Sequence, residues 1–209
     1  DYYHKLRQQQ LIAAQLSRLN LQSELSALKA QLNPHFLYNV FNTINAAIPT
    51  TAKHARDMVN TLSDLFRYQL KASREELVTV GEELAFVTKY LELEKERFGE
   101  RLLFEIDMDE DLLEEKIPPI LIQPIVENAV KHGISPLIEG GKITLQIKRT
   151  INTLEIVIRD TGAGIDGQQK KDLLKRGVGL SNTDERLKKM YGKGLKIEGN
   201  APQGKTDQL

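Results

Sequence analysis

The sequence contains no cysteine, no long apolar run and no excess of charge of either sign. The absence of cysteine excludes disulfide bonds and thiolate metal sites. No apolar stretch approaches the roughly 18–20 residues of a membrane-spanning helix. Lys and Arg together number 29, as do Asp and Glu, so no basic field marks a nucleic acid as a direct partner. There is no secretory signal and the first residue is Asp1 rather than Met, so we expect a piece of a longer protein.

The first third of the sequence is predicted to form a helical hairpin. Residues 1–48 have the pattern of one helix, and apolar positions spaced by three and four residues give it a seam for a paired helix. The seam consists of Leu11, Ala14, Arg18, Leu21, Leu25, Leu28 and Leu32. Pro34 removes a backbone donor and predicts a kink. After a break at residues 49–51, a second amphipathic helix is expected over 52–72. Two such hairpins, if they pair, make a four-helix bundle.

The rest of the sequence mixes helix and strand patterns. Thr79-Val80-Gly81-Glu82 resembles a capping box that opens a helix over 81–98. The apolar stripe of this helix consists of Leu84, Val87 and Leu91. Further helices are expected over 120–133 and 181–191, and strands over 101–107, 142–148, 153–159 and 195–198. This pattern predicts an α+β chain in which a helical hairpin (residues 1–75) precedes an α/β sandwich (residues 76–209) with helices on one sheet face.

Three polar segments of the second half suggest a nucleotide pocket, and the first lies in the helix predicted over 120–133. Asn128, Lys131 and His132 are three and four residues apart, so they share a helix face. An amide oxygen suits Mg²⁺, and an ammonium group one turn later suits a phosphate. The segment read alone fits equally well a polar helix face that ends at a His-Gly cap.

The second segment, Asp160-Thr161-Gly162-Ala163-Gly164, directly follows a predicted strand. Its glycines allow the backbone to approach a flat ligand closely. A carboxylate at the end of a strand, here that of Asp160, can accept a hydrogen bond from an exocyclic amine such as that of adenine. A plain Asp-Gly turn is the alternative.

The third segment is Gly177-Val178-Gly179-Leu180-Ser181-Asn182, ahead of a predicted helix. Its backbone amides are therefore suited to phosphate oxygens. A lone Gly-x-Gly is also compatible with a flexible turn, and neither the dinucleotide fingerprint nor a Gly-x-x-x-x-Gly-Lys loop is present.

The order of the three segments resembles the N, G1 and G2 boxes of the GHKL ATP-binding superfamily, which includes gyrase-type ATPases, histidine kinases and certain serine kinases. The resemblance implies a GHKL-type sandwich that binds ATP and Mg²⁺, with Asn128 as the metal ligand and residues 166–176 as a lid. The implied pocket residues are Asn128, Lys131, His132, Asp160, Thr161, Gly162, Gly164, Gly177, Gly179, Leu180 and Asn182. The ATPase branch carries a catalytic glutamate where this chain has Pro124, which argues against simple hydrolysis.

The stretch Leu32-Asn33-Pro34-His35-Phe36-Leu37-Tyr38-Asn39 is similar to the phosphoacceptor box of LytS-like sensor histidine kinases. Residues 91–99, 117–124 and 182–187 also resemble that family. The resemblance implies that His35 accepts a phosphoryl group from ATP and passes it to an aspartate on the receiver domain of a response regulator. It further implies a homodimer, the cytoplasmic portion of a bacterial inner-membrane or plasma-membrane protein, attached through an upstream sensor segment.

Two departures and two rival functions accompany this interpretation. Phe36 stands where many other histidine kinases carry an acidic base, and the last strand of the fold is missing, from which we infer truncation. Asn39 lies one helical turn after His35, so it either orients the imidazole, positions a water, or is a polar surface residue. The rivals are a GHKL ATPase with a helical dimerisation arm and a degenerate module that binds nucleotide and signals by shape.

Overall fold

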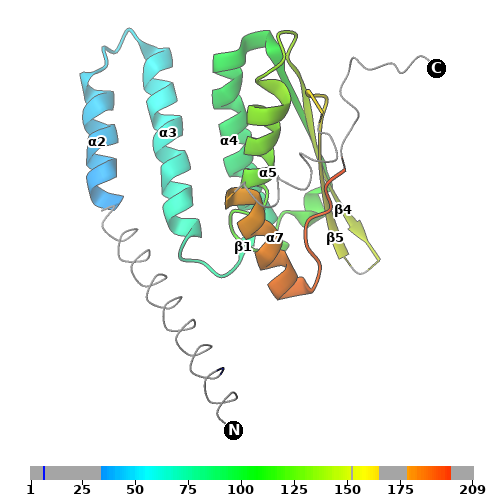
Figure 1. Ribbon diagram of the computed structural model, residues 1–209. Coiled ribbons are helices and arrows are strands. Elements are labelled where there is room, and N and C mark those ends of the chain that lie inside the picture. Colours follow the sequence, from blue (N-terminus) through cyan, green and yellow to red (C-terminus); the bar gives the residue numbers. More distant parts are fainter. Residues whose placement is uncertain (1–6, 8–33, 152, 165–177, 199–209) are drawn as a thin grey trace, which may run out of the picture. The chain divides into compact units, whose positions relative to one another are not determined.

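The computed structural model describes residues 7, 34–151, 153–164 and 178–198 (Figure 1). The chain divides into two compact units, residues 1–63 and 64–209. The predicted domain boundary at residue 75 stays a prediction. The apolar seam between Leu11 and Leu32 lies outside the described residues, as does the chain immediately before Pro34, where the kink was expected.

The described part of the first unit contains two helices joined by a short turn, as the sequence predicts. Helix α2 spans Pro34–Ala47, and helix α3 spans Lys53–Ala72 and continues into the second unit. Polar side chains link the two helices inside the first unit. Asn45 donates from Nδ2 to Oδ1 of Asn60 at 2.7 Å, and Arg56 donates from Nε to Oδ1 of Asn45 at 3.2 Å.

The C-terminal turns of α3 belong to the second unit and pack antiparallel on helix α4, which spans Val80–Phe98. Lys89 pairs with Asp64 at 2.6 Å, whereas Lys71, nearly two turns further along α3, pairs with Glu82 near the start of α4. Both ion pairs are exposed and each contributes little to stability. They show the register of the two helices, because residue numbers rise along one helix as they fall along the other.

The predicted capping box at the start of α4 is present. The hydroxyl of Thr79 accepts a hydrogen bond from the backbone N–H of Glu82, and the Glu82 carboxylate accepts one from the N–H of Thr79, both at 3.0 Å. Two backbone donors at the helix end are thereby satisfied. The stripe of Leu84, Val87 and Leu91 is buried, as predicted.

A three-stranded sheet forms the centre of the second unit. Its strands are β2 (Leu102–Met108), β4 (Gly141–Thr150) and β5 (Thr153–Asp160). The order is β2-β4-β5, with β2 parallel to β4 and β5 antiparallel to it. A small antiparallel pair joins β1 (Val78–Thr79) to β3 (Lys116–Ile117). The three strands predicted over 101–107, 142–148 and 153–159 are confirmed, with ends that differ by one or two residues.

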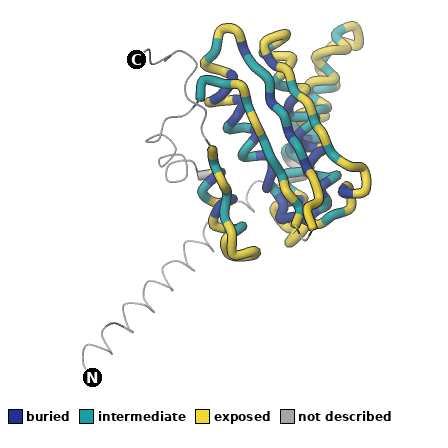
Figure 2. The backbone as a smooth tube through the Cα atoms, turned by 90° about the vertical axis from the view of Figure 1, so that its right-hand side faces the viewer, coloured by how far each residue is buried: buried dark blue, intermediate teal, exposed yellow. Residues whose placement is uncertain are grey.

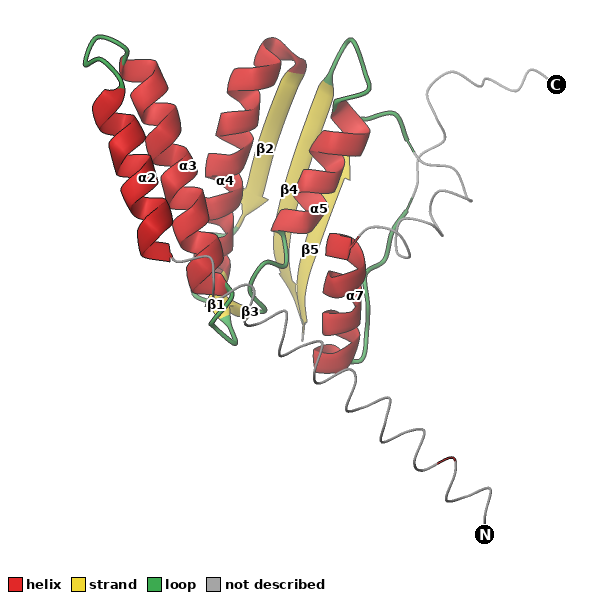
Figure 3. Ribbon diagram, turned by 60° about the vertical axis from the view of Figure 1, so that its left-hand side comes forward, coloured by secondary structure: helices red, strands yellow, loops and turns green. Residues whose placement is uncertain are grey.

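One face of this sheet is apolar and the other is polar. Ile143, Leu145 and Ile147 of β4 are completely buried, whereas Thr144, Gln146 and Lys148, which alternate with them on the opposite face, are polar. Buried and more exposed positions alternate along the strands of the sheet (Figure 2). The helices α4, α5 (Gln123–Asn128) and α7 (Val178–Tyr191) lie on one side of the sheet (Figure 3). The predicted α/β sandwich is therefore confirmed, and its core lies between the sheet and these helices.

The prediction of one continuous α-helix over 120–133 is wrong in where the helix starts and in its helix type. Residues 120–122 are not helical, α5 begins only at Gln123, and a π-helical segment, η3, follows over Ala129–Ile134. The π pattern appears as a hydrogen bond from the N–H of Ser135 to the carbonyl of Val130. The start is delayed because a side chain, the carboxylate of Glu83, binds the amides of residues 120–122.

The C-terminal predictions also need correction. Helix α7 begins at Val178, three residues before the predicted start, and no strand forms over 195–198. The backbone N–H of Leu195 donates to Oδ1 of Asp184 at 2.7 Å rather than to a neighbouring strand. The Lys188 ammonium and this N–H lower the pKa of the Asp184 carboxyl. Among the described residues, no helix combines the length and apolar character that a membrane span requires.

Replacement of Thr79 by Ala removes one half of the capping box and leaves an amide of α4 without its side-chain acceptor. We expect a loss of about 1 kcal/mol in the free energy of unfolding, measured by urea denaturation. Thr88→Ala, within the same helix, is the matched control, and we expect a change below about 0.5 kcal/mol. Equal losses in the two variants would contradict the capping role.

Candidate functional site

The turn after β5 meets the π-helical segment η3 in a close backbone contact. The N–H of Gly162 donates to Oδ1 of Asp160 at 2.9 Å, and the N–H of Ala163 donates to the carbonyl of Gly133 at 3.0 Å. A β-carbon at Gly133 would lie 2.5 Å from Oδ1 of Asp160. Only glycine allows this approach. The structure thus places two of the predicted segments, Asn128–Gly133 and Asp160–Gly164, against each other.

Gly162 is needed at this contact for the same reason. A β-carbon there would lie 2.4 Å from both Cα and the carbonyl carbon of Gly133. Backbone atoms cannot move aside as a flexible side chain can, so any larger residue forces the two segments apart. Gly164 has a different requirement, since its φ of 72° lies in the left-handed region.

Thr161 extends the pairing of β5 with β4 by one residue. Its N–H donates to the carbonyl of Lys142 at 3.0 Å, and its hydroxyl accepts the N–H of Lys142 at 2.9 Å. The hydroxyl therefore fixes the turn that carries Asp160. This contact gives Thr161 a structural task beside the nucleotide role that the sequence suggests.

Asn128 is the last residue of α5 and is partly buried, while Lys131 and His132 are exposed on η3. The expected shared face of these residues assumed α-helical spacing. In the π-helical turn, hydrogen bonds run from residue i to i+5, so the position that follows Asn128 on the next turn shifts towards His132 and Gly133. Single π-helical turns are frequent at functional sites.

The third segment is partly described. Gly179, Leu180 and Asn182 lie in α7, whereas Gly177 and the predicted lid over 166–176 lie outside the described residues. A β-carbon at Gly179 would lie 3.3 Å from Cβ of Pro124, so the first turn of α7 packs against α5. Leu180 is buried, and Gly179 and Asn182 are exposed. The amides of this first turn have no partner within the helix ladder.

A buried glutamate near these helices was missed from the sequence. Glu83 of α4 is 0% exposed, and its carboxylate accepts the backbone N–H groups of Ile120, Leu121 and Ile122. Glu82 and Glu83 lie in the first turn of α4, where acidic side chains usually face solvent, so Glu83 was not predicted as a core position. A signal was present, because Glu83 lies four residues before Val87 and so shares its buried face.

Ile120 is held from both sides in an unusual conformation. Its φ is 55°, which costs a side-chain-bearing residue about 1–2 kcal/mol. Its N–H donates to Glu83, and its carbonyl accepts a hydrogen bond from Nη2 of Arg186 at 3.0 Å. Burial lowers the pKa of the Arg186 guanidinium, and the carboxylate of Glu83 opposes that shift. Arg186 comes from α7, so the segment before α5 connects α4 with α7.

The candidate phosphoacceptor lies in the first unit. His35 is the second described residue of α2, and Asn39 follows one turn later with an exposed side chain. The carbonyl of Asn39 accepts a hydrogen bond from Oγ1 of Thr43 at 2.7 Å. Within the described ranges, no group of three or more His, Asp or Glu side chains gathers to hold a metal ion.

Comparison with protein families supports two regions in this order. The family described as histidine kinase matches residues 23–102, and the family described as histidine kinase-, DNA gyrase B- and HSP90-like ATPase matches residues 117–208. The chain thus combines a histidine kinase region with an ATPase-type nucleotide-binding domain.

Three curated relatives match most of this chain. Sensor histidine kinase YpdA of Escherichia coli is 36% identical over 88% of this chain and 34% of its own length, and sensor protein LytS of Oceanobacillus iheyensis is 34% identical over 87% and 33%. YwpD of Bacillus subtilis is 38% identical over 87% of the chain and 67% of its own length. The chain belongs to the LytS-like sensor histidine kinases. It spans about a third of the length of the first two relatives.

A solved structure also resembles the chain. The histidine kinase domain of the blue-light activated kinase EL346 from Erythrobacter litoralis gives a TM-score of 0.46 at 18% identity. The match covers 69% of this chain and 68% of that one.

The contact between Gly162 and Gly133 yields a testable prediction. Gly162→Ala should lower the free energy of unfolding by about 1–3 kcal/mol, because the added methyl group meets backbone. Gly99→Ala is the control, since its methyl group meets no atom within 4 Å and only its φ of 60° opposes the change. Urea denaturation measures both. A smaller loss for Gly162→Ala than for Gly99→Ala would contradict the close approach.

Proposed function

We propose that this chain is the kinase part of a two-component sensor, which transfers the γ-phosphoryl group of ATP to His35 and then to an aspartate of a response regulator. The observation that carries the proposal is the close contact of Gly133 with Asp160 and Gly162, because it joins two of the family's nucleotide motifs in one place. Membership of the sensor histidine kinase family supports the reaction type.

The nucleotide base is assigned to the turn after β5. Oδ1 of Asp160 already accepts the N–H of Gly162, and a carboxylate offers further lone pairs for the exocyclic amine of adenine. Gly162 and Gly164 allow a flat ring to approach the backbone. The tie between Thr161 and Lys142 keeps this turn in place before ligand binds. Such preorganisation reduces the cost of binding.

The phosphates are assigned to the helix ends on either side. Lys131 is exposed and would neutralise phosphate charge, and His132 lies next to it. The amides of Gly179 and Leu180 in the first turn of α7, with the side chain of Asn182, would bind phosphate oxygens, and the family's motif adds Gly177. The amide oxygen of Asn128 would be the protein ligand of Mg²⁺. With no acidic cluster among the described residues, phosphate oxygens and water would complete the shell, as is usual for this ion. When bound, Mg²⁺ supplies charge neutralisation at the phosphates.

The chemical step needs positioning more than a strong base. A lone pair of a neutral imidazole nitrogen of His35 attacks the γ-phosphorus, the bond from that phosphorus to the bridging oxygen breaks, and ADP leaves with the electron pair. The other ring nitrogen then loses its proton to water. About half of an ordinary imidazole population is neutral near pH 6.5. The reaction therefore does not require a carboxylate base at position 36, where this chain has Phe36. Asn39 orients the ring from one helical turn away.

The second transfer regenerates the histidine. A carboxylate oxygen of the response regulator attacks the same phosphorus, and the electrons of the phosphorus–nitrogen bond return to the imidazole. Homodimerisation through the hairpin is part of the proposal. Met58 and Leu62 lie four residues apart on α3 and each remains 37% exposed, which supports pairing with the hairpin of a second copy. Attachment to a membrane sensor is proposed from the family alone.

The acceptor is tested by labelling. Purified protein incubated with γ-labelled ATP and Mg²⁺ should take up label that is stable in base and labile in acid, and His35→Gln should abolish it. His54→Gln on α3 is the matched control and should label at the wild-type rate. Label that persists in His35→Gln would refute the acceptor assignment. Release of phosphate without protein labelling would instead favour an ATPase.

The adenine contact is tested by Asp160→Asn. Asn keeps an oxygen for the N–H of Gly162 but replaces the other acceptor with a donor, so ATP affinity should fall about tenfold or more while the fold is retained. Calorimetric titration measures the affinity and thermal melting checks the fold. Asp107→Asn, on the exposed sheet face, is the control and should bind ATP as the wild type does. Unchanged affinity in Asp160→Asn would remove the adenine role.

A further inference from the structure

Glu83 is a buried charge that the proposed chemistry does not use. Burial of a carboxylate costs several kcal/mol of hydration unless donors replace the lost water. Four donors do so here. The hydroxyl of Tyr68 donates to Oε1 at 2.6 Å, the amide of Ile120 also reaches Oε1, and the amides of Leu121 and Ile122 reach Oε2 at 3.1 and 3.0 Å. Every hydrogen bond to this carboxylate is charge-assisted and therefore strong.

Three of these donors directly precede the helix that carries Asn128. Residues 120–122 lead into α5 at Gln123, and Asn128 ends that helix. The carboxylate therefore fixes the position at which α5 begins and the direction in which it runs. Because α5 is only six residues long, a displacement of its start is passed to Asn128 within two turns.

The same segment is tied to α7. The carbonyl of Ile120 accepts a hydrogen bond from Arg186, four residues after Asn182 on that helix. Both backbone groups of Ile120 are therefore engaged, one by α4 and one by α7. Its φ of 55° is kept only because these contacts hold it. One cluster around the buried Glu83, consisting of Tyr68, Glu83, Ile120–Ile122 and Arg186, thus reaches both helices that border the candidate nucleotide site.

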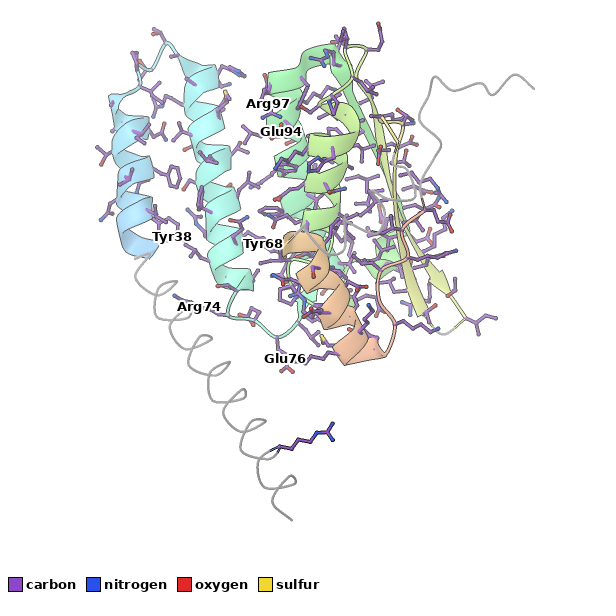
Figure 4. The ribbon with its side chains drawn as sticks, in the orientation of Figure 1. Tyr38, Tyr68, Arg74, Glu76, Glu94 and Arg97 are labelled. Atoms are coloured by element: carbon purple, nitrogen blue, oxygen red, sulfur yellow. The ribbon has the colours of Figure 1, made fainter. Side chains whose placement is uncertain are left out.

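Tyr68 connects this cluster to the part of α3 that belongs to the second unit. Tyr68 lies in the last two turns of α3 (Figure 4). Its ring packs on Phe86, with 4.9 Å between the ring centroids. Burial and the hydrogen bond to Glu83 raise the pKa of the Tyr68 phenol, so it remains a donor at neutral pH. Helix α3 runs without interruption from Lys53 to Ala72, so Tyr68 belongs to a helix of the hairpin whose other helix carries His35.

We propose that Glu83 and Tyr68 are positioning residues for phosphoryl transfer: Glu83 sets the place of the Asn128 helix, and the Tyr68 hydroxyl couples that helix to α3. This inference rests on the proposed kinase function. Loss of the Tyr68 hydroxyl leaves Glu83 bound to its three amides, so nucleotide binding is retained while the coupling to α3 is lost. Loss of the Glu83 charge affects both.

The key variant is Tyr68→Phe, which removes one oxygen and keeps the ring on Phe86. The rate of His35 labelling at saturating ATP should fall about tenfold, as expected for loss of one hydrogen bond to a charged group, while ATP affinity stays within about twofold of wild type. Tyr90→Phe is the matched control, because Tyr90 is also a partly buried tyrosine of this core and faces a glutamate, Glu94. It should leave both quantities unchanged. Rates are normalised to the folded fraction.

Amide hydrogen exchange gives a readout that does not depend on catalysis. Exchange at residues 120–122 should be at least about threefold faster in Tyr68→Phe and about tenfold faster in Glu83→Gln than in wild type and Tyr90→Phe. Glu83→Gln should also weaken ATP binding about tenfold, and Tyr68→Phe covers the case in which Glu83→Gln does not fold.

The outcomes separate the two proposals. If the wild type is labelled and Tyr68→Phe is labelled at the same rate, the coupling is refuted and the kinase function stands. If the wild type is not labelled, the kinase function fails, and exchange decides the positioning role. Wild-type exchange at residues 120–122 in Tyr68→Phe overturns that role, whereas faster exchange there with wild-type exchange in Tyr90→Phe supports it. A lower melting temperature with an unchanged labelling rate per folded molecule would mean that the hydroxyl is only structural, and would also overturn the inference.

Discussion

The arrangement of the second unit depends on one buried carboxylate. Glu83 replaces its lost hydration with a phenol and three consecutive amides, and these amides in turn would be unpaired in the core without it. The carboxylate and its donors depend on each other, so a substitution that removes either one leaves buried polar groups of the other without a partner. Because the donors come from α3 and from the start of α5 while the acceptor comes from α4, a single charged group relates three helices. One of these helices leads to the candidate site, because α5 ends at Asn128, and the segment at the start of α5 is also bound by Arg186 of α7.

Features set by local sequence were predictable. The 3.6-residue period located α3 and α4, the alternation at Ile143, Leu145 and Ile147 located β4, and Thr79 with Glu82 marked the start of a helix. Features set by tertiary contacts were not. The late start of α5 depends on Glu83, which is 37 residues away from Ile120 in sequence. The missing strand over 195–198 reflects the engagement of Leu195 by Asp184, which no periodicity encodes.

In the candidate site, too, some features were predictable from local sequence and others depend on tertiary contacts. The order of the three motifs indicated a nucleotide pocket, although each motif alone allowed a plainer explanation. The sequence could not show that Gly133 and Gly162 touch, because this contact depends on how η3 packs on the end of β5. It also could not show that the Thr161 hydroxyl is engaged with Lys142, or that π-helical geometry changes the spacing after Asn128. Residue type identified the participants, and tertiary packing determined their neighbours.

The parallel pairing of β2 with β4 has a consequence for how the protein folds. Parallel neighbours cannot be joined by a tight turn, and here β2 ends at Met108 while β4 starts at Gly141. The intervening chain includes β3, α5 and η3, so the sheet closes only after that whole segment has been drawn together. Contacts of such long range form late and slowly. The helix that bears Asn128 is therefore a crossover of the sheet as well as part of the candidate pocket, and folding errors there would remove core and site together.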